Sequence, residues 1–162
     1  MSRSIRIASG PGASSGHDYD RVGHNFLFVV VREGSAAVNH IPVSAVVIAY
    51  NDEPNMRACL ESITWADEII VVDSHSTDAT ERISREFTDQ VYQHDFHGFG
   101  RLRNEALTHA THDWVFSLDT DERATPELRD EIRRVLAAGP EAEAYFVPRK
   151  NYFLGRWIKH CG

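Results

Sequence analysis

Two aspartates that lie two residues apart, Asp119 and Asp121, are the strongest candidates for chemistry in this sequence. They directly follow an apolar run, Trp114 to Leu118, which is typical of a buried strand. Helix capping explains them less well than other acidic residues, because Thr125 and Pro126 already provide the start of the next helix. Two carboxylates this close repel one another unless a cation lies between them. Such hard oxygen ligands suit Mg²⁺ or Mn²⁺, with phosphate oxygens completing the coordination shell, so we predict a divalent-cation site; an ordinary acidic loop is the alternative.

Two other apolar runs also end in polar residues. Val43 to Ile48 leads into Tyr50-Asn51-Asp52-Glu53, and Ile69 to Val72 leads into Asp73. The ordinary explanation for acids in such loops is helix capping, which fits Asp78 well because an acidic residue follows three positions later. The alternative is that these loops form a ligand site together with the two aspartates.

The elements that must position these loops follow one another regularly from Ile41 onward. Apolar runs alternate with helical patterns in the order β-α-β-α-β-α-β-α-β. This order predicts an α/β fold with a mostly parallel, Rossmann-like sheet and helices on both faces. Right-handed crossovers bring the loops that follow the strands to one edge of the sheet, where ligands bind. Residues 1–40 contain a Gly/Ser cluster and no sustained period, so we predict a disordered leader in which Phe26 to Val31 could form one stray strand.

The composition excludes several functional classes. The net charge is −7, with 24 acidic and 17 basic residues, which argues against a nucleic-acid binder. The longest apolar run has six residues, too few to cross a bilayer. The two cysteines, Cys59 and Cys161, have neither disulfide nor metal spacing, and the histidine pairs at three-residue spacing lack a third ligand nearby, so we predict no zinc site. We expect a cytoplasmic protein, with peripheral contact at the inner face of the membrane left open.

Taken together, three blocks resemble the family 2 glycosyltransferases of GT-A fold in both order and spacing. They are residues 41–53, residues 71–78 and the segment Leu118-Asp119-Thr120-Asp121-Glu122, which contains an Asp-x-Asp (DXD) motif. Gly98-Phe99-Gly100, which leads to Arg103-Asn104, resembles the family's segment before its third helix. Trp65-Ala66-Asp67-Glu68 and residues 151–157 are similar to the branch that builds lipopolysaccharide or lipooligosaccharide core, whose members often attach glucose from UDP-glucose. The resemblance covers residues 41–162, which we predict to be the nucleotide-sugar-binding part of a GT-A domain.

The resemblance implies a role for each matching residue. Tyr50, Asn51 and Glu53 would border the nucleotide, and Asp73 would accept a hydrogen bond from the uracil or ribose. Arg103 would lie near the base or diphosphate, the alternative being a solvated helix residue. Asp119 would approach the ribose and the metal, and Asp121 would bind the metal directly. The implied partners are a UDP-sugar donor and a glycan or lipid-linked glycan acceptor.

The resemblance also implies an inverting displacement in which a carboxylate deprotonates the acceptor hydroxyl. In the family this base lies downstream of a point that matches His160-Cys161-Gly162, so we expect the base beyond Gly162 and a fold that is incomplete at its C-terminus. Residues 148–162 contain no carboxylate. A catalytically inactive nucleotide-sugar-binding fragment is therefore a second possibility. A nucleotidyltransferase would need a glycine-rich loop after the first strand, and a receiver-like module would need an aspartate after the third; the sequence has neither.

Overall fold

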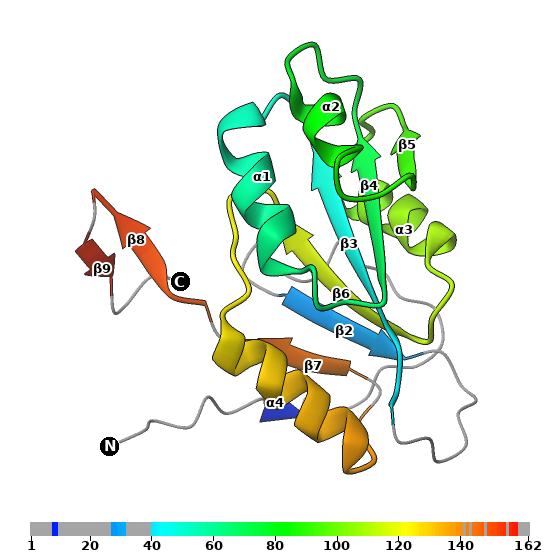
Figure 1. Ribbon diagram of the computed structural model, residues 1–162, viewed down its shortest axis with the longest axis vertical. Helices are drawn as coiled ribbons and strands as arrows, with labels where there is room; N and C mark the ends of the chain where they lie inside the picture. The colour runs from blue at the N-terminus through cyan, green and yellow to red at the C-terminus, as the bar shows by residue number, and fades with distance from the viewer. Residues whose placement is uncertain are drawn as a thin grey trace.

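The computed structural model of the chain describes residues 8–9, 27–31, 40–140, 142, 144–147, 149–154 and 156–158. These residues form a seven-stranded sheet in the order β1-β7-β2-β6-β3-β4-β5, four helices and a two-stranded hairpin (Figure 1). The prediction of an α/β fold is therefore confirmed.

The parallel half of the sheet is the part that positions the predicted site. It contains β3 (Val43–Ala49), β4 (Glu68–Asp73), β5 (Val91–Gln93) and β6 (Trp114–Asp119). Every residue of β3 is buried, because helices cover both of its faces. In the register of the sheet, Ala49 lies opposite Asp73 and Ile48 lies opposite Asp119. The carboxyl ends of β3, β4 and β6 therefore meet at one edge.

The other half of the sheet is antiparallel and includes two segments of the predicted leader. β2 (Leu27–Val31) lies between β6 and β7 (Ala144–Val147), and β1 (Ala8–Ser9) pairs with β7. The stray strand is thus present, and the prediction of a disordered leader is wrong for these two segments because both pair with the sheet. The other residues of the leader up to Asn39 lie outside the described residues, so that part of the prediction stays untested.

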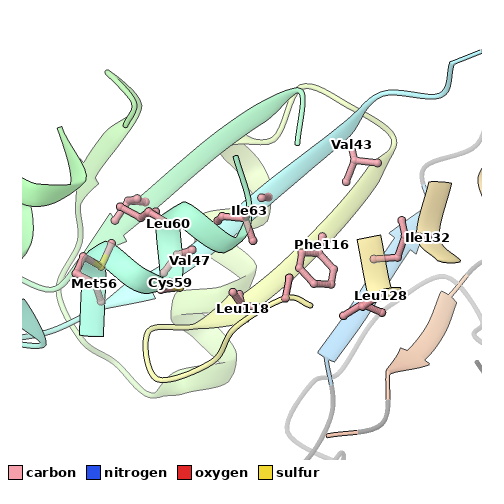
Figure 2. Close-up of a cluster of buried hydrophobic side chains, with 14 of the residues drawn as sticks. Val43, Val47, Met56, Cys59, Leu60, Ile63, Phe116, Leu118, Leu128 and Ile132 are labelled. Atoms are coloured by element: carbon pink, nitrogen blue, oxygen red, sulfur yellow. The ribbon is translucent and has the colours of Figure 1, made fainter. Parts of the chain in front are cut away.

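Helices cover both faces of the sheet, as predicted. α1 (Glu53–Ser62), α2 (Thr80–Ser84) and α4 (Pro126–Ala137) contribute to one hydrophobic cluster, and α3 (Phe99–His109) contributes to the other. In Figure 2, residues of α1 and α4 point toward Val43, Val47 and Phe116 of the sheet. The alternate β3 residues Val46 and Ile48 face α3 instead.

Local sequence signals explain where the helices begin. Thr125 caps α4 as predicted, since its hydroxyl accepts a hydrogen bond from the Leu128 amide at 3.3 Å. Gly98 precedes α3 with a φ of 103°, a conformation that favours glycine. α2 ends at Ser84, so Phe87 lies beyond the helix, although its side chain still packs against the core.

The chain continues from β7 into a hairpin formed by β8 (Asn151–Phe153) and β9 (Arg156–Ile158). Figure 1 shows this hairpin projecting away from the seven-stranded sheet. In the part of the chain that the structure describes, no helix has the length and apolar character needed to cross a membrane.

Candidate functional site

The loops after β3 and β4 are joined to each other by hydrogen bonds from predicted site residues. The Asn51 side-chain oxygen accepts from the Thr77 amide at 2.7 Å, and Asn51 itself has a positive φ of 45°, which asparagine tolerates. The Glu53 carboxylate accepts from the Ala79 amide at 3.1 Å. Asn51 and Glu53 thus use these oxygen atoms to connect the two loops. The side chain of Tyr50 is 63% exposed, so its ring is open to a ligand.

Asp78 connects the same two loops. One of its carboxylate oxygens accepts from the Thr80 amide at 2.9 Å, and the other accepts from the Glu53 amide at 3.0 Å. These bonds support the helix-capping explanation for Asp78, although Ala79 is the N-cap residue of α2.

Asp73 is fully buried at the end of β4. Its carboxylate accepts hydrogen bonds from the Ser76 amide at 2.9 Å, from the Ser76 hydroxyl and from the Gln93 side-chain amide at 2.9 Å. Gln93 in turn accepts from the His75 amide at 3.1 Å, so it links β5 to this loop. Sequence reasoning missed Gln93, because nothing near it in the chain indicates that it faces Asp73.

Asp119 and Asp121 differ sharply in their contacts. Asp119 Oδ1 accepts from Arg103 Nη2 at 2.5 Å, and Arg149 Nη2 lies 3.8 Å from Asp119 Oδ2. The side chain of Arg103 is only 28% exposed, so the alternative of a solvated helix residue is wrong. Asp121 is exposed, and its carboxylate has no hydrogen bond or ion pair to any residue in the described ranges. Asp121 is therefore the carboxylate with the most freedom to bind a cation.

Glu122 holds the acidic loop in shape. Its Oε2 accepts from the Asp119 amide at 3.0 Å, and its Oε1 lies 2.6 Å from Nε of Arg149. Burial raises the pKa of Glu122, although the hydrogen bond from Asp119 and the nearby Arg149 oppose this effect. The sequence indicates Glu122 only as part of the acidic segment and gives it no role of its own. It does not predict the contact with Arg149, because Arg149 reaches the loop from beyond β7 and leaves no local signature.

The acidic loop is also anchored to α1. The Thr120 hydroxyl donates to Asp52 Oδ2 at 2.5 Å, and Asp52 accepts a second hydrogen bond from the Asn55 side chain at 2.9 Å. Asp52 is the N-cap residue of α1, yet its side chain makes no capping bond to the helix. The loops after β3, β4 and β6 thus form one connected unit.

The residues present fit a divalent cation that is shared with a ligand. Asp119 and Asp121 supply hard carboxylate oxygens of the kind that Mg²⁺ and Mn²⁺ prefer. Within the described ranges, no group of three or more His, Cys, Asp or Glu residues is arranged to hold a metal. A cation held by these two aspartates would therefore need ligand or water oxygens to complete its shell, as is usual where a metal is bound together with phosphates. The guanidinium groups of Arg103 and Arg149 add positive charge beside the acidic pair.

Comparison with known proteins identifies the family. The sequence model of glycosyl transferase family 2 matches residues 44–160. This chain belongs to the family 2 glycosyltransferases. Over 120 residues it is 32% identical to the lipopolysaccharide core biosynthesis glycosyltransferase LpsC of Rhizobium meliloti, covering 71% of this chain and 44% of LpsC. It is 34% identical to an uncharacterized glycosyltransferase of Rickettsia bellii, covering 59% of this chain and 33% of that protein. The chain thus spans less than half the length of these relatives.

Solved structures show the same fold. TarS 1-349 of S. aureus superimposes with a TM-score of 0.51 and 29% identity, covering 59% of this chain and 32% of TarS 1-349. Glucosyl-3-phosphoglycerate synthase from Mycobacterium tuberculosis, in complex with Mn²⁺, UDP and glucosyl-3-phosphoglycerate, gives a TM-score of 0.52 and 25% identity, covering 62% of this chain and 41% of that protein. The predicted GT-A fold is thereby confirmed.

Proposed function

We propose that this glycosyltransferase moves a sugar, with glucose from UDP-glucose as the first candidate, to a lipopolysaccharide core or another glycan acceptor. The observation that carries the proposal is the pair Asp119 and Asp121, which stands where the carboxyl ends of β3, β4 and β6 meet and leaves Asp121 without a protein partner among the described residues. The named function of LpsC supports the acceptor class, and the UDP and Mn²⁺ bound by the mycobacterial enzyme support the donor and the metal.

In this proposal each residue acts on a different part of the donor. Asp73 is fully buried and already accepts from Ser76 and Gln93, so its carboxylate must exchange one of these bonds to accept from the uracil or ribose. The exposed ring of Tyr50 borders the nucleotide. Asp119 and Asp121 would hold a divalent cation, which neutralises negative charge on the departing diphosphate. Arg103 contributes further positive charge from its present position on Asp119. A carboxylate beyond Gly162, as the family resemblance implies, would deprotonate the acceptor in a single inverting displacement.

A second candidate function is binding of the nucleotide sugar without transfer. Residues 148–162, which follow the last strand of the main sheet, contain no carboxylate, so none of these residues can deprotonate an acceptor hydroxyl. Both candidates require the same donor site and differ only in chemistry after binding.

Isothermal titration of UDP into the protein, with Mn²⁺ or with a chelator, tests the donor site shared by both candidates. We expect Mn²⁺ to tighten UDP binding at least about tenfold, equivalent to ~1.4 kcal/mol. GDP serves as the control for base recognition. UDP-glucose with Mn²⁺ is then followed for hydrolysis to UDP and glucose, with water as the acceptor. Hydrolysis supports the transferase, and its absence supports the binding protein. A dissociation constant for UDP that is the same with Mn²⁺ and with the chelator contradicts the metal-assisted proposal.

A further inference from the structure

His94 and His109 bring two imidazole nitrogens together outside the donor site. His94 directly follows β5, and His109 is the last residue of α3. The two Nε2 atoms are 3.1 Å apart, and both side chains are half-buried. The backbone amide of His94 donates to the Asp73 carbonyl at 3.1 Å, so the pair is tied to the end of β4.

Neighbouring side chains orient both rings. Glu105 Oε2 lies 3.3 Å from His94 Nδ1, where it favours a proton on Nδ1 and leaves a lone pair on Nε2. Tyr92 stacks on His109 with ring centroids 3.7 Å apart and an interplanar angle of 7°. Arg101, whose Nε lies 3.4 Å from the other Glu105 oxygen, is the remaining charged group with a contact to this cluster among the described residues. A carboxylate that holds one ring nitrogen and leaves the other as an acceptor is the arrangement by which proteins orient a histidine for metal binding.

The spacing of the two nitrogens suits a shared ion. If each Nε2 lies about 2.1 Å from one Zn²⁺, a separation of 3.1 Å corresponds to an N–Zn–N angle of about 95°.

We infer that His94 and His109 form a binding site for one borderline-soft transition-metal ion such as Zn²⁺, with Glu105 as the positioning residue for His94. Since the described residues contain no group of three metal-binding side chains, water must complete the shell. The histidine pairs at three-residue spacing do not include this one, which forms between the end of β5 and the end of α3. This inference does not rest on the proposed function.

Competition for Zn²⁺ with a fluorescent zinc indicator tests the site. The experiment uses the 162-residue chain carrying Asp121→Ala, which removes the acidic site as a source of signal. We expect one Zn²⁺ per chain, and at least about tenfold weaker binding after His94→Gln or His109→Gln, since even loss of a carboxylate partner costs about 10–100-fold. His97→Gln is the matched control, because His97 is exposed and has the same side chain in the same loop.

Glu105→Gln separates metal binding from packing, because it leaves both imidazoles in place. We expect it to weaken Zn²⁺ binding about tenfold. Circular dichroism confirms that each variant is folded. Zinc affinity that is unchanged in His94→Gln and His109→Gln, or that falls equally in His97→Gln, overturns the inference and leaves a direct N–H···N hydrogen bond as the reason for the short contact.

Discussion

Glu68 is the buried carboxylate whose replacement most directly tests how the amino-terminal ends of β3 and β4 are held together, at the sheet edge opposite the candidate site. It is 8% exposed and stands at the start of β4. Its Oε2 accepts from the Ser44 hydroxyl at 2.5 Å and from the Thr111 amide at 2.9 Å. Its Oε1 accepts from the Gln90 side chain at 3.1 Å and from the Thr111 hydroxyl at 3.0 Å. Glu68 therefore connects β3, β4 and the segment after α3.

Two of these donors are held in place around Glu68. The Thr111 amide is fixed by the backbone, and the oxygen of the fully buried Ser44 side chain also accepts from the His112 amide at 3.2 Å. Glu68→Ala leaves both donors unsatisfied, at roughly 1–3 kcal/mol each, so we expect the free energy of unfolding to fall by about 2–6 kcal/mol. Glu68→Gln can keep its amide oxygen on these two donors and lose only the charge, so we expect a loss of about 1–2 kcal/mol.

The pH dependence of this loss has a definite sign. Burial alone raises the pKa of Glu68, but the hydrogen bonds from Ser44, Thr111 and Gln90 outweigh it, so the folded pKa lies below the ordinary value. The stabilisation is therefore complete above the unfolded pKa of about 4.3 and disappears as the pH falls through the folded value. We expect the difference in unfolding free energy between the parent and Glu68→Gln to shrink as the pH is lowered below about 4.

Urea unfolding followed by circular dichroism at pH 7, 5, 4 and 3 measures these differences. Glu61→Ala and Glu61→Gln are the matched controls, because Glu61 is exposed on α1. The reasoning is refuted if Glu68→Ala destabilises the protein no more than Glu61→Ala. It is equally refuted if the loss in Glu68→Gln stays constant from pH 7 to pH 3.

Three further predictions concern the site and the core. Arg103→Met should weaken UDP binding in the presence of Mn²⁺ about tenfold. Arg103→Lys should have an intermediate effect, because lysine keeps the positive charge but lacks the planar guanidinium group. Titration curves that are unchanged in both variants contradict this prediction. Burial raises the pKa of the Cys59 thiol to about 12. In the Cys161→Ser variant, alkylation of Cys59 at pH 8 should therefore be at least ~100-fold slower in the folded protein than in the protein unfolded in urea. Comparable alkylation rates in the two states refute this prediction. Thr125→Ala should lower the free energy of unfolding by about 1 kcal/mol, measured in urea, whereas Thr108→Ala within α3 should not.

Local patterns in the sequence were sufficient to predict the elements that carry the site. The apolar run of β3 is buried on both faces, so it appears in the sequence without alternation. The cap at Thr125 predicts the start of α4 correctly because capping depends on adjacent residues. That Asp73 and Asp119 lie at the same edge of the sheet follows from the parallel pairing of β4 and β6 with β3.

Contacts between distant segments could not be predicted in this way. β2 lies between β6 and β7, yet its residues carry no signal that selects those neighbours. Arg149 reaches Asp119 and Glu122 from 27 or more positions along the chain, and a basic residue near a strand end has many possible partners. The contact between His94 and His109 likewise depends on how α3 packs beside β5.

The most direct test of the central claim measures how much Mn²⁺ increases the affinity for UDP in the parent protein and in Asp121→Ala. The dissociation constant of UDP is determined by titration with and without Mn²⁺ for both proteins, with Asp89→Ala as an exposed control. If Asp121 holds the cation that shields the diphosphate, Mn²⁺ should tighten UDP binding by at least about tenfold in the parent and in Asp89→Ala and have almost no effect in Asp121→Ala. The same enhancement in all three proteins would contradict the account.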